Sequence, residues 1–134
     1  MSKQKIAYWV VTALVALSMT MSAGMYLTAQ PQALEGFRHL GYPEYFRLIL
    51  GVAKLLGAVA LLAPVPRTLK EWAYAGFAFN MIAAAASHAG VGDGAGQIVS
   101  PLIALGLVLT SHQLWRRVSA GSTQAEPAVQ PARA

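Results

Sequence analysis

Two strongly polar residues interrupt long apolar stretches of this chain and are its first candidates for chemistry. Lys54 lies near the middle of one stretch, and Asn80 lies near the middle of the next. A lysine in an apolar segment of membrane length is costly, so it marks a functional site by default. Asn80 could accept a hydrogen bond from Lys54 but brings no counter-charge. We therefore expect Lys54 to be neutral or to be solvated by a polar cavity.

The depths of these two residues match. Lys54 lies about ten residues before Pro64, and Asn80 lies about ten residues after Lys70. At about 1.5 Å per residue, each is about 15 Å from the same membrane face, near the midplane. Two antiparallel helices joined by a short turn can bring such residues together. The sequence predicts an intramembrane polar site of Lys54 and Asn80, and the alternative is a purely structural hydrogen bond between helices.

A second polar group is expected where the same stretches reach the opposite membrane face. This outer rim consists of Glu44, Arg47, Ser87, His88 and Asp93. Carboxylates beside a histidine could handle protons or hold a polar headgroup, and the alternative is a solvated set of ion pairs. No pair of these residues has the spacing of metal ligands on a helix, so no metal site is predicted. No residue is assigned a catalytic role.

Composition places the chain in the membrane class. Of its 134 residues, 56% are apolar and 11% are charged, against about 25% charged in a soluble domain. The net charge of +5 does not by itself exclude any functional class. However, the sequence has no basic stripe interleaved with aromatic residues, which nucleic-acid binding would favour. The chain has no cysteine, which excludes disulfides and dithiol redox centres. No intrinsic cofactor is expected, so redox chemistry would come from a bound molecule or a partner.

The apolar stretches predict an all-α fold with four transmembrane helices, at about 6–29, 45–63, 72–89 and 98–114. They form one membrane domain over residues 1–118, followed by a disordered tail at 119–134, whose composition is polar and proline-containing. The first stretch, of about 24 residues, exceeds the apolar region of a signal peptide, which is about 7 to 15 residues long. We therefore expect it to be retained. The connection between the first two helices is expected to hold a short interfacial helix or a re-entrant turn.

Basic residues predict the orientation of this bundle. Three pairs fall on one side of a four-helix arrangement, namely Lys3 and Lys5, Arg67 and Lys70, and Arg116 and Arg117. Lysine and arginine accumulate on the cytoplasmic side of membrane proteins. The sequence thus predicts a multi-pass protein with both termini in the cytoplasm, located in the plasma (inner) membrane if the chain is bacterial.

Four motifs together resemble those of the DoxX-like family of small four-helix membrane proteins: LGYPEYF at 40–46, LGVAKLLGAVALLAP at 50–64, LKEWAYAGFAF at 69–79 and SHAGVGD at 87–93. The resemblance implies a four-helix bundle in which Lys54 is a usual feature. Many relatives carry an aspartate where this chain has Asn80, so an ion pair with Lys54 that is natural in them is absent here. Named relatives are membrane subunits linked to quinone-dependent sulfur oxidation or to redox homeostasis, and most members have no assigned activity.

Three functions are compatible with these residues. The first is a membrane subunit or accessory protein, for instance of a quinone-linked redox complex, which binds a membrane partner, a second copy of itself or a lipid-soluble molecule. The second is a small transporter or proton-linked permease that uses Lys54, Asn80 and His88, although the chain lacks an internal inverted repeat. The third is a structural or chaperone-like bundle. The first is favoured, and independent enzymatic activity is not expected.

Overall fold

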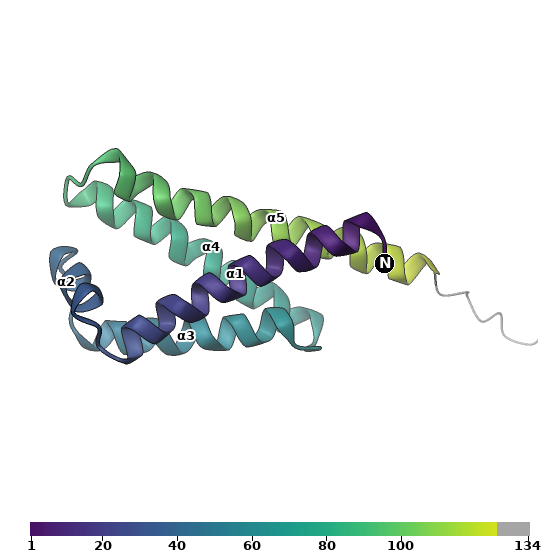
Figure 1. The fold of residues 1–134 in the computed structure, drawn as a ribbon, viewed down its shortest axis with the longest axis horizontal. Coiled ribbons are helices and arrows are strands. Elements are labelled where there is room, and N and C mark those ends of the chain that lie inside the picture. Colours follow the sequence, from purple (N-terminus) through teal and green to yellow (C-terminus); the bar gives the residue numbers. More distant parts are fainter. Residues whose placement is uncertain (126–134) are drawn as a thin grey trace, which may run out of the picture.

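The computed structural model describes residues 1–125, and within this range the chain forms five α-helices and no β-strand (Figure 1). The helices are α1 (Lys3–Leu27), α2 (Pro31–His39), α3 (Tyr45–Leu62), α4 (Arg67–Gly90) and α5 (Ala95–Ala125). Four are long, and α2 is the short helix expected in the first connection. The all-helical fold class is confirmed.

Local sequence signals account for where several helices begin and end. The hydroxyl of Ser2 accepts a hydrogen bond from the backbone N–H of Lys5 at 3.2 Å and so caps the start of α1. Ala63 is extended, and Pro64 and Pro66 follow it, so α3 cannot continue past Leu62. The chain reverses after α4 through Gly92, whose φ of +79° favours glycine.

Helix α1 packs between α3 and α5, and α4 completes the bundle by packing against α5 and, less extensively, against α3. The core consists of buried apolar side chains from all four long helices, namely Tyr8, Val15, Met19, Leu61, Tyr74, Phe77, Met81, Val108 and Trp115. Because α3 and α4 share the smallest of these helix contacts, the space for a site is expected on their side of the bundle.

Apolar side chains also cover the outside of the bundle, as in a protein surrounded by lipid. Leu14 on α1, Leu56 on α3 and Ile103 on α5 are all exposed. Helices α1, α3 and α5 are long and apolar enough to cross a membrane. Helix α4 does not meet that criterion, and Asn80 and His88 are among the polar residues that lower its hydropathy. Three of the four expected spans therefore have the length and apolar composition of membrane-crossing helices.

The ends of the long helices gather at two poles (Figure 1). The N-terminus, the α3–α4 turn and the C-terminal part of α5 lie at one pole, whereas α2 and the α4–α5 turn lie at the other. The three basic pairs belong to segments of the first pole. Successive connections between the long helices thus lie at opposite poles, in the order that the loop charges predict.

The predicted boundaries need correction at the C-terminus. The fourth apolar helix was expected to end near 114 and to be followed by a disordered tail from 119, but α5 continues to Ala125. The physical reason is packing, because Trp115 is buried in the core and Val118 packs against it. Residues 126–134 of the expected tail lie outside the described residues.

Candidate functional site

Lys54 lies on the inner face of α3 and is only 5% exposed. Its Nζ donates to Ser22 Oγ at 2.8 Å and to Tyr26 OH at 3.3 Å. The Nζ also lies 4.5 Å from the centre of the Tyr26 ring, within cation–π range. An ammonium has three donors, and both of its partners here are neutral hydroxyls of α1. Among the described residues, no carboxylate forms an ion pair with Lys54.

The expected hydrogen bond between Lys54 and Asn80 is not formed among the described residues. Both side chains nevertheless line one cavity of about 550 Å³. The partners come from α1 because α1, and not α4, packs most closely against α3. Gly51, one turn before Lys54, permits this approach, since a Cβ there would lie 2.8 Å from the Leu27 side chain.

We call this cavity the chamber. It is lined by residues of α1, α3, α4 and α5, and its polar lining comprises Ser18, Ser22, Tyr26, Lys54, Asn80, His88, Gln97 and Ser100. Pro101 of α5 also lines it and lacks the N–H that would bond to the carbonyl of Gln97 in a regular helix. The chamber therefore offers hydroxyl, amide and carbonyl groups around one buried cation.

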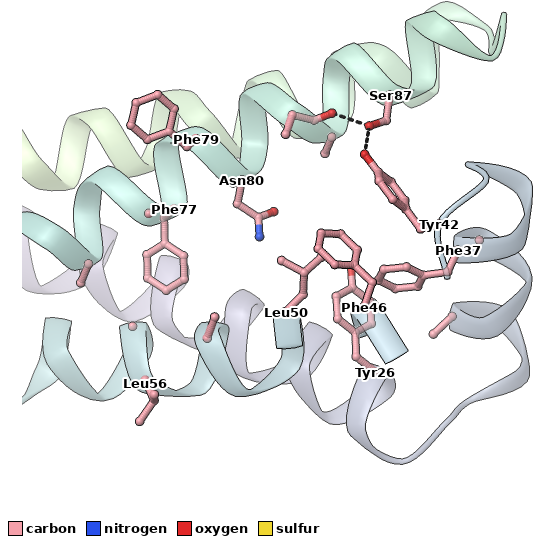
Figure 2. A pocket seen from close by; sticks show the side chains of 18 of the residues that line it. Tyr26, Phe37, Tyr42, Phe46, Leu50, Leu56, Phe77, Phe79, Asn80 and Ser87 are labelled. Atoms are coloured by element: carbon pink, nitrogen blue, oxygen red, sulfur yellow. Dashed lines mark hydrogen bonds between the residues drawn. The ribbon is translucent and has the colours of Figure 1, made fainter. Parts of the chain in front are cut away.

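A larger apolar cavity of about 1020 Å³ lies between α3 and α4 and reaches under α2. We call it the groove. Figure 2 shows Asn80 projecting from α4 into the groove, with Phe77 on one side and Phe46 and Tyr26 on the other. Its remaining lining is largely aliphatic and aromatic. The groove is a surface on which the chain of a lipid-soluble molecule could lie.

Chamber and groove adjoin each other. Tyr26, Asn80, Ala84 and His88 belong to the lining of both. Asn80 thus stands in the wall between a polar space that contains Lys54 and an apolar space without a charged residue. A molecule with a polar end and an apolar chain could occupy both.

The outer rim forms two contacts that tie helix ends together. His39 Nε2 lies 2.6 Å from Asp93 Oδ1, and His88 Nδ1 lies 2.6 Å from Asp93 Oδ2. These imidazole hydrogen bonds, that of His88 above all, hold the pKa of the Asp93 carboxyl below its usual value. Tyr42 and Ser87 add a hydrogen bond between hydroxyls (Figure 2). The end of α2 is thereby fastened to the end of α4.

The other rim residues, Glu44 and Arg47, lie at the start of α3. Arg47 Nη1 donates to the carbonyl oxygen of Tyr26 at 2.7 Å, and Nη2 lies 3.8 Å from Glu44 Oε1. Arg47 Nε is buried without a hydrogen-bond partner. Arg47 therefore adds a second, incompletely satisfied cation to the face of α3 that carries Lys54.

A protein-family model described as the DoxX-like family matches residues 10–111. The chain belongs to the DoxX-like family. Neither the curated proteins nor the solved structures gave a match. The matched range contains Lys54, Asn80 and the whole outer rim.

Sequence reasoning missed several site residues of this DoxX-like protein. Ser22 and Tyr26 hold Lys54, and the signal for them was a polar row with Ser18 at spacings of four on the first helix. His39 was not assigned to the rim, although it shares Asp93 with His88. Within residues 1–125, no group of three or more histidine or carboxylate side chains is arranged to hold a metal ion. The absence of a metal site stays a prediction.

Proposed function

We propose that this DoxX-like protein spans the membrane four times, with both termini in the cytoplasm, and binds the polar end of a lipid-soluble molecule in the chamber. It acts in this proposal as a membrane subunit or accessory protein. Helix α4 is the fourth span. Its 24 residues extend for about 36 Å, longer than a hydrocarbon core of about 30 Å, and Asn80 and His88 line internal cavities instead of facing lipid.

One observation carries the proposal: in the described part of the chain, a lysine that is almost fully buried has only hydroxyl groups as hydrogen-bond partners, in a polar chamber that adjoins an apolar groove. Leaving a charge in such a place costs several kcal/mol unless other groups compensate for it. A packing contact alone would need no lysine. Both cavities lie near the range of about 300–1,000 Å³ that is usual for small-molecule sites.

Quinones are one class of molecule with the required chemistry. A quinone carbonyl could accept a hydrogen bond from Lys54 Nζ or the Asn80 amide, and its apolar chain could lie in the groove against Phe46 and Phe77. Because the chain has no cysteine, its own residues supply no dithiol for electron transfer. The redox step of such a complex would take place in a partner protein. The DoxX-like protein would deliver the membrane-dissolved molecule to that partner.

The proposal is tested by purifying the full chain with its native lipids and identifying the co-purifying proteins and small molecules by mass spectrometry. Wild type is compared with Lys54→Met and with Lys70→Met. Lys70 is the matched control because it is also buried but lies at the start of α4, at the pole that carries the three basic pairs, and outside the chamber. We expect a lipid-soluble molecule to be retained by wild type and Lys70→Met and depleted in Lys54→Met.

Identical small molecules and partners in all three preparations, with only a lower stability of Lys54→Met, would refute ligand binding and favour a structural bundle. Substrate-dependent flux in liposomes that Lys54→Met abolishes would instead favour a transporter.

A further inference from the structure

We propose that the molecule held in the chamber is a single-chain amphiphile with a carboxylate head, such as a fatty acid. Its carboxylate pairs with Lys54, and its chain leaves the bundle sideways through the groove. This inference rests on the proposed function, because it names the class of ligand for the same site.

The first argument is the charge balance around Lys54. Three of the four carboxylates among residues 1–125 contact other cations or histidines: Glu44 lies near Arg47, Glu71 contacts His112 and Asp93 contacts two histidines. The fourth, Glu35, is exposed on α2. Within this described range Lys54 thus has no counter-charge, and Arg47 on the same helix face has a buried Nε without a hydrogen-bond partner. An anion complements this face better than a neutral carbonyl does.

The second argument is the apolar path that adjoins the chamber. Small residues line the groove on both sides, namely Ala53 on α3 and Gly76 and Ala83 on α4. Figure 2 shows Asn80 projecting into the groove between the rings of Phe46 and Phe77. The chain of an amphiphile can lie along this path while its polar head stays beside Lys54.

The third argument concerns depth. Lys54 lies about 15 Å from the cytoplasmic face, by its distance along α3 from Pro64. A carboxylic acid can lose its charge by protonation and so enter hydrocarbon, whereas a phosphodiester keeps its charge. A carboxylate head therefore reaches Lys54 from the bilayer at a lower cost than a phosphate head does.

The test measures binding of tritiated palmitate to the delipidated full chain in nanodiscs. The competitors are unlabelled palmitate, its methyl ester, palmitoyl lysophosphatidate and decylubiquinone. Hydrogen bonds between charged partners are about twice as strong as neutral ones. We therefore expect the methyl ester to compete at least about tenfold more weakly than palmitate.

Two pairs of variants locate the site. Lys54→Met should weaken palmitate binding at least about tenfold, whereas Lys70→Met should not. Ala53→Trp keeps Lys54 but fills the groove, so it should also reduce binding. Its control is Val52→Trp, because Val52 is exposed and lines neither cavity. Monodisperse elution and an unchanged helical signal establish that each variant is folded.

Equal competition by palmitate and its methyl ester, or unchanged binding by Lys54→Met, would overturn the inference. If lysophosphatidate competes better than palmitate, the assignment of a carboxylate head to the ligand is wrong. If decylubiquinone binds in a Lys54-dependent way and palmitate does not, the proposed function stands and this inference falls. If neither binds, both fall.

Discussion

Lys54 and Lys70 are both buried lysines, and their surroundings show why only one marks a site. Lys70 lies at the basic pole, where its Nζ is 6.0 Å from the centre of the Trp115 ring. Lys54 lies near mid-helix and is held by two hydroxyls of α1 beside a cavity. Packing against Trp115 therefore explains Lys70, whereas the surroundings of Lys54 indicate a ligand site.

A second polar cluster lies inside the bundle and has a structural role. Ser111 of α5 forms hydrogen bonds of 2.7 Å with Thr12 of α1 and with Tyr74 of α4. Thr12 and Ser111 are fully buried. These bonds join three helices at one point, and none of the three residues lines the chamber or the groove.

Replacing Ser111 by alanine should therefore destabilise the protein. The change leaves the hydroxyls of Thr12 and Tyr74 without their shared partner, at a cost of about 1–3 kcal/mol. Unfolding of the detergent-solubilised protein measures the effect. Thr110→Ala is the matched control, because Thr110 is exposed and bonds to Gly106 in its own helix. An equal effect of both changes would contradict the structural role of the cluster.

The sequence allowed the burial of Lys54 to be predicted, because a lysine in an apolar segment is expected to face the interior of the bundle. Its partners could not be predicted. A polar row on a helix does not say which neighbouring helix approaches most closely, and adjacency in the chain favoured Asn80 of α4 over Ser22 of α1.

At the scale of helices, the contact between α3 and α4 is set by glycine. A Cβ at Gly57 would lie 2.6 Å from the Phe77 ring, so α4 approaches α3 closely at this point. Towards α2 the two helices leave the groove open. Gly57 thus marks a point of close contact between the two helices within the lining of the groove, which continues past it to Val65 and Leu69 near the α3–α4 turn.

Gly57→Ala should destabilise the bundle by about 1–3 kcal/mol, because the new methyl group forces the Phe77 ring or the helix to move. The control is Gly76→Ala on α4, where a Cβ has nothing within 4 Å. That change should be neutral or stabilise by up to about 1 kcal/mol, because alanine favours the helix. Both are measured as shifts of the unfolding midpoint. Destabilisation by Gly76→Ala alone would contradict the contact.

The contact of Asp93 with His39 and His88 should make stability depend on pH in the acid range. The pKa of the carboxyl is lowered in the folded protein from its ordinary value of 3.8. The stabilisation is therefore complete above about pH 5, where the carboxyl is ionised in both the folded and the unfolded protein, and is lost as the pH falls through the lowered pKa.

Asp93→Asn removes this titration. The stability difference between wild type and Asp93→Asn should shrink as the pH is lowered from about 5, in unfolding curves recorded at successive pH values. Glu35→Gln, at an exposed carboxylate of α2, serves as the control and should show no such trend. A stability difference between the two proteins that grows towards acid pH would contradict the lowered pKa of Asp93.

The helices themselves were more predictable than their ends. Four apolar stretches and the proline pair after α3 predicted the long helices and one sharp turn. The length of α5 could not be read from hydropathy, because its last turns are polar, whereas Trp115 and Val118 pack against the core just past the predicted end. Likewise, only packing shows that α2 is fastened by its last residue, His39, to the α4–α5 turn.

At the scale of the whole molecule, the poles seen in Figure 1 match the distribution of basic residues. The N-terminus, the α3–α4 turn and the C-terminal part of α5 share one pole, which the proposal places in the cytoplasm. The chain contains no cysteine, so single introduced thiols can report which side each pole faces.

Thr68→Cys marks the cytoplasmic pole, and Gly94→Cys marks the outer pole. In intact cells, a membrane-impermeant maleimide should label Gly94→Cys and spare Thr68→Cys, because the bilayer shields the cytoplasmic thiol. In inverted vesicles the pattern should reverse. Labelling of both positions from one side would contradict a membrane-spanning α4.

The most direct test of a ligand at Lys54 is native mass spectrometry of the intact protein released from gentle detergent. It weighs the chain together with whatever it holds. We predict that wild type and Lys70→Met carry one additional small molecule per chain, and that Lys54→Met has the mass of the bare polypeptide. Identical spectra for wild type and Lys54→Met, with or without a bound molecule, would contradict the role given to Lys54.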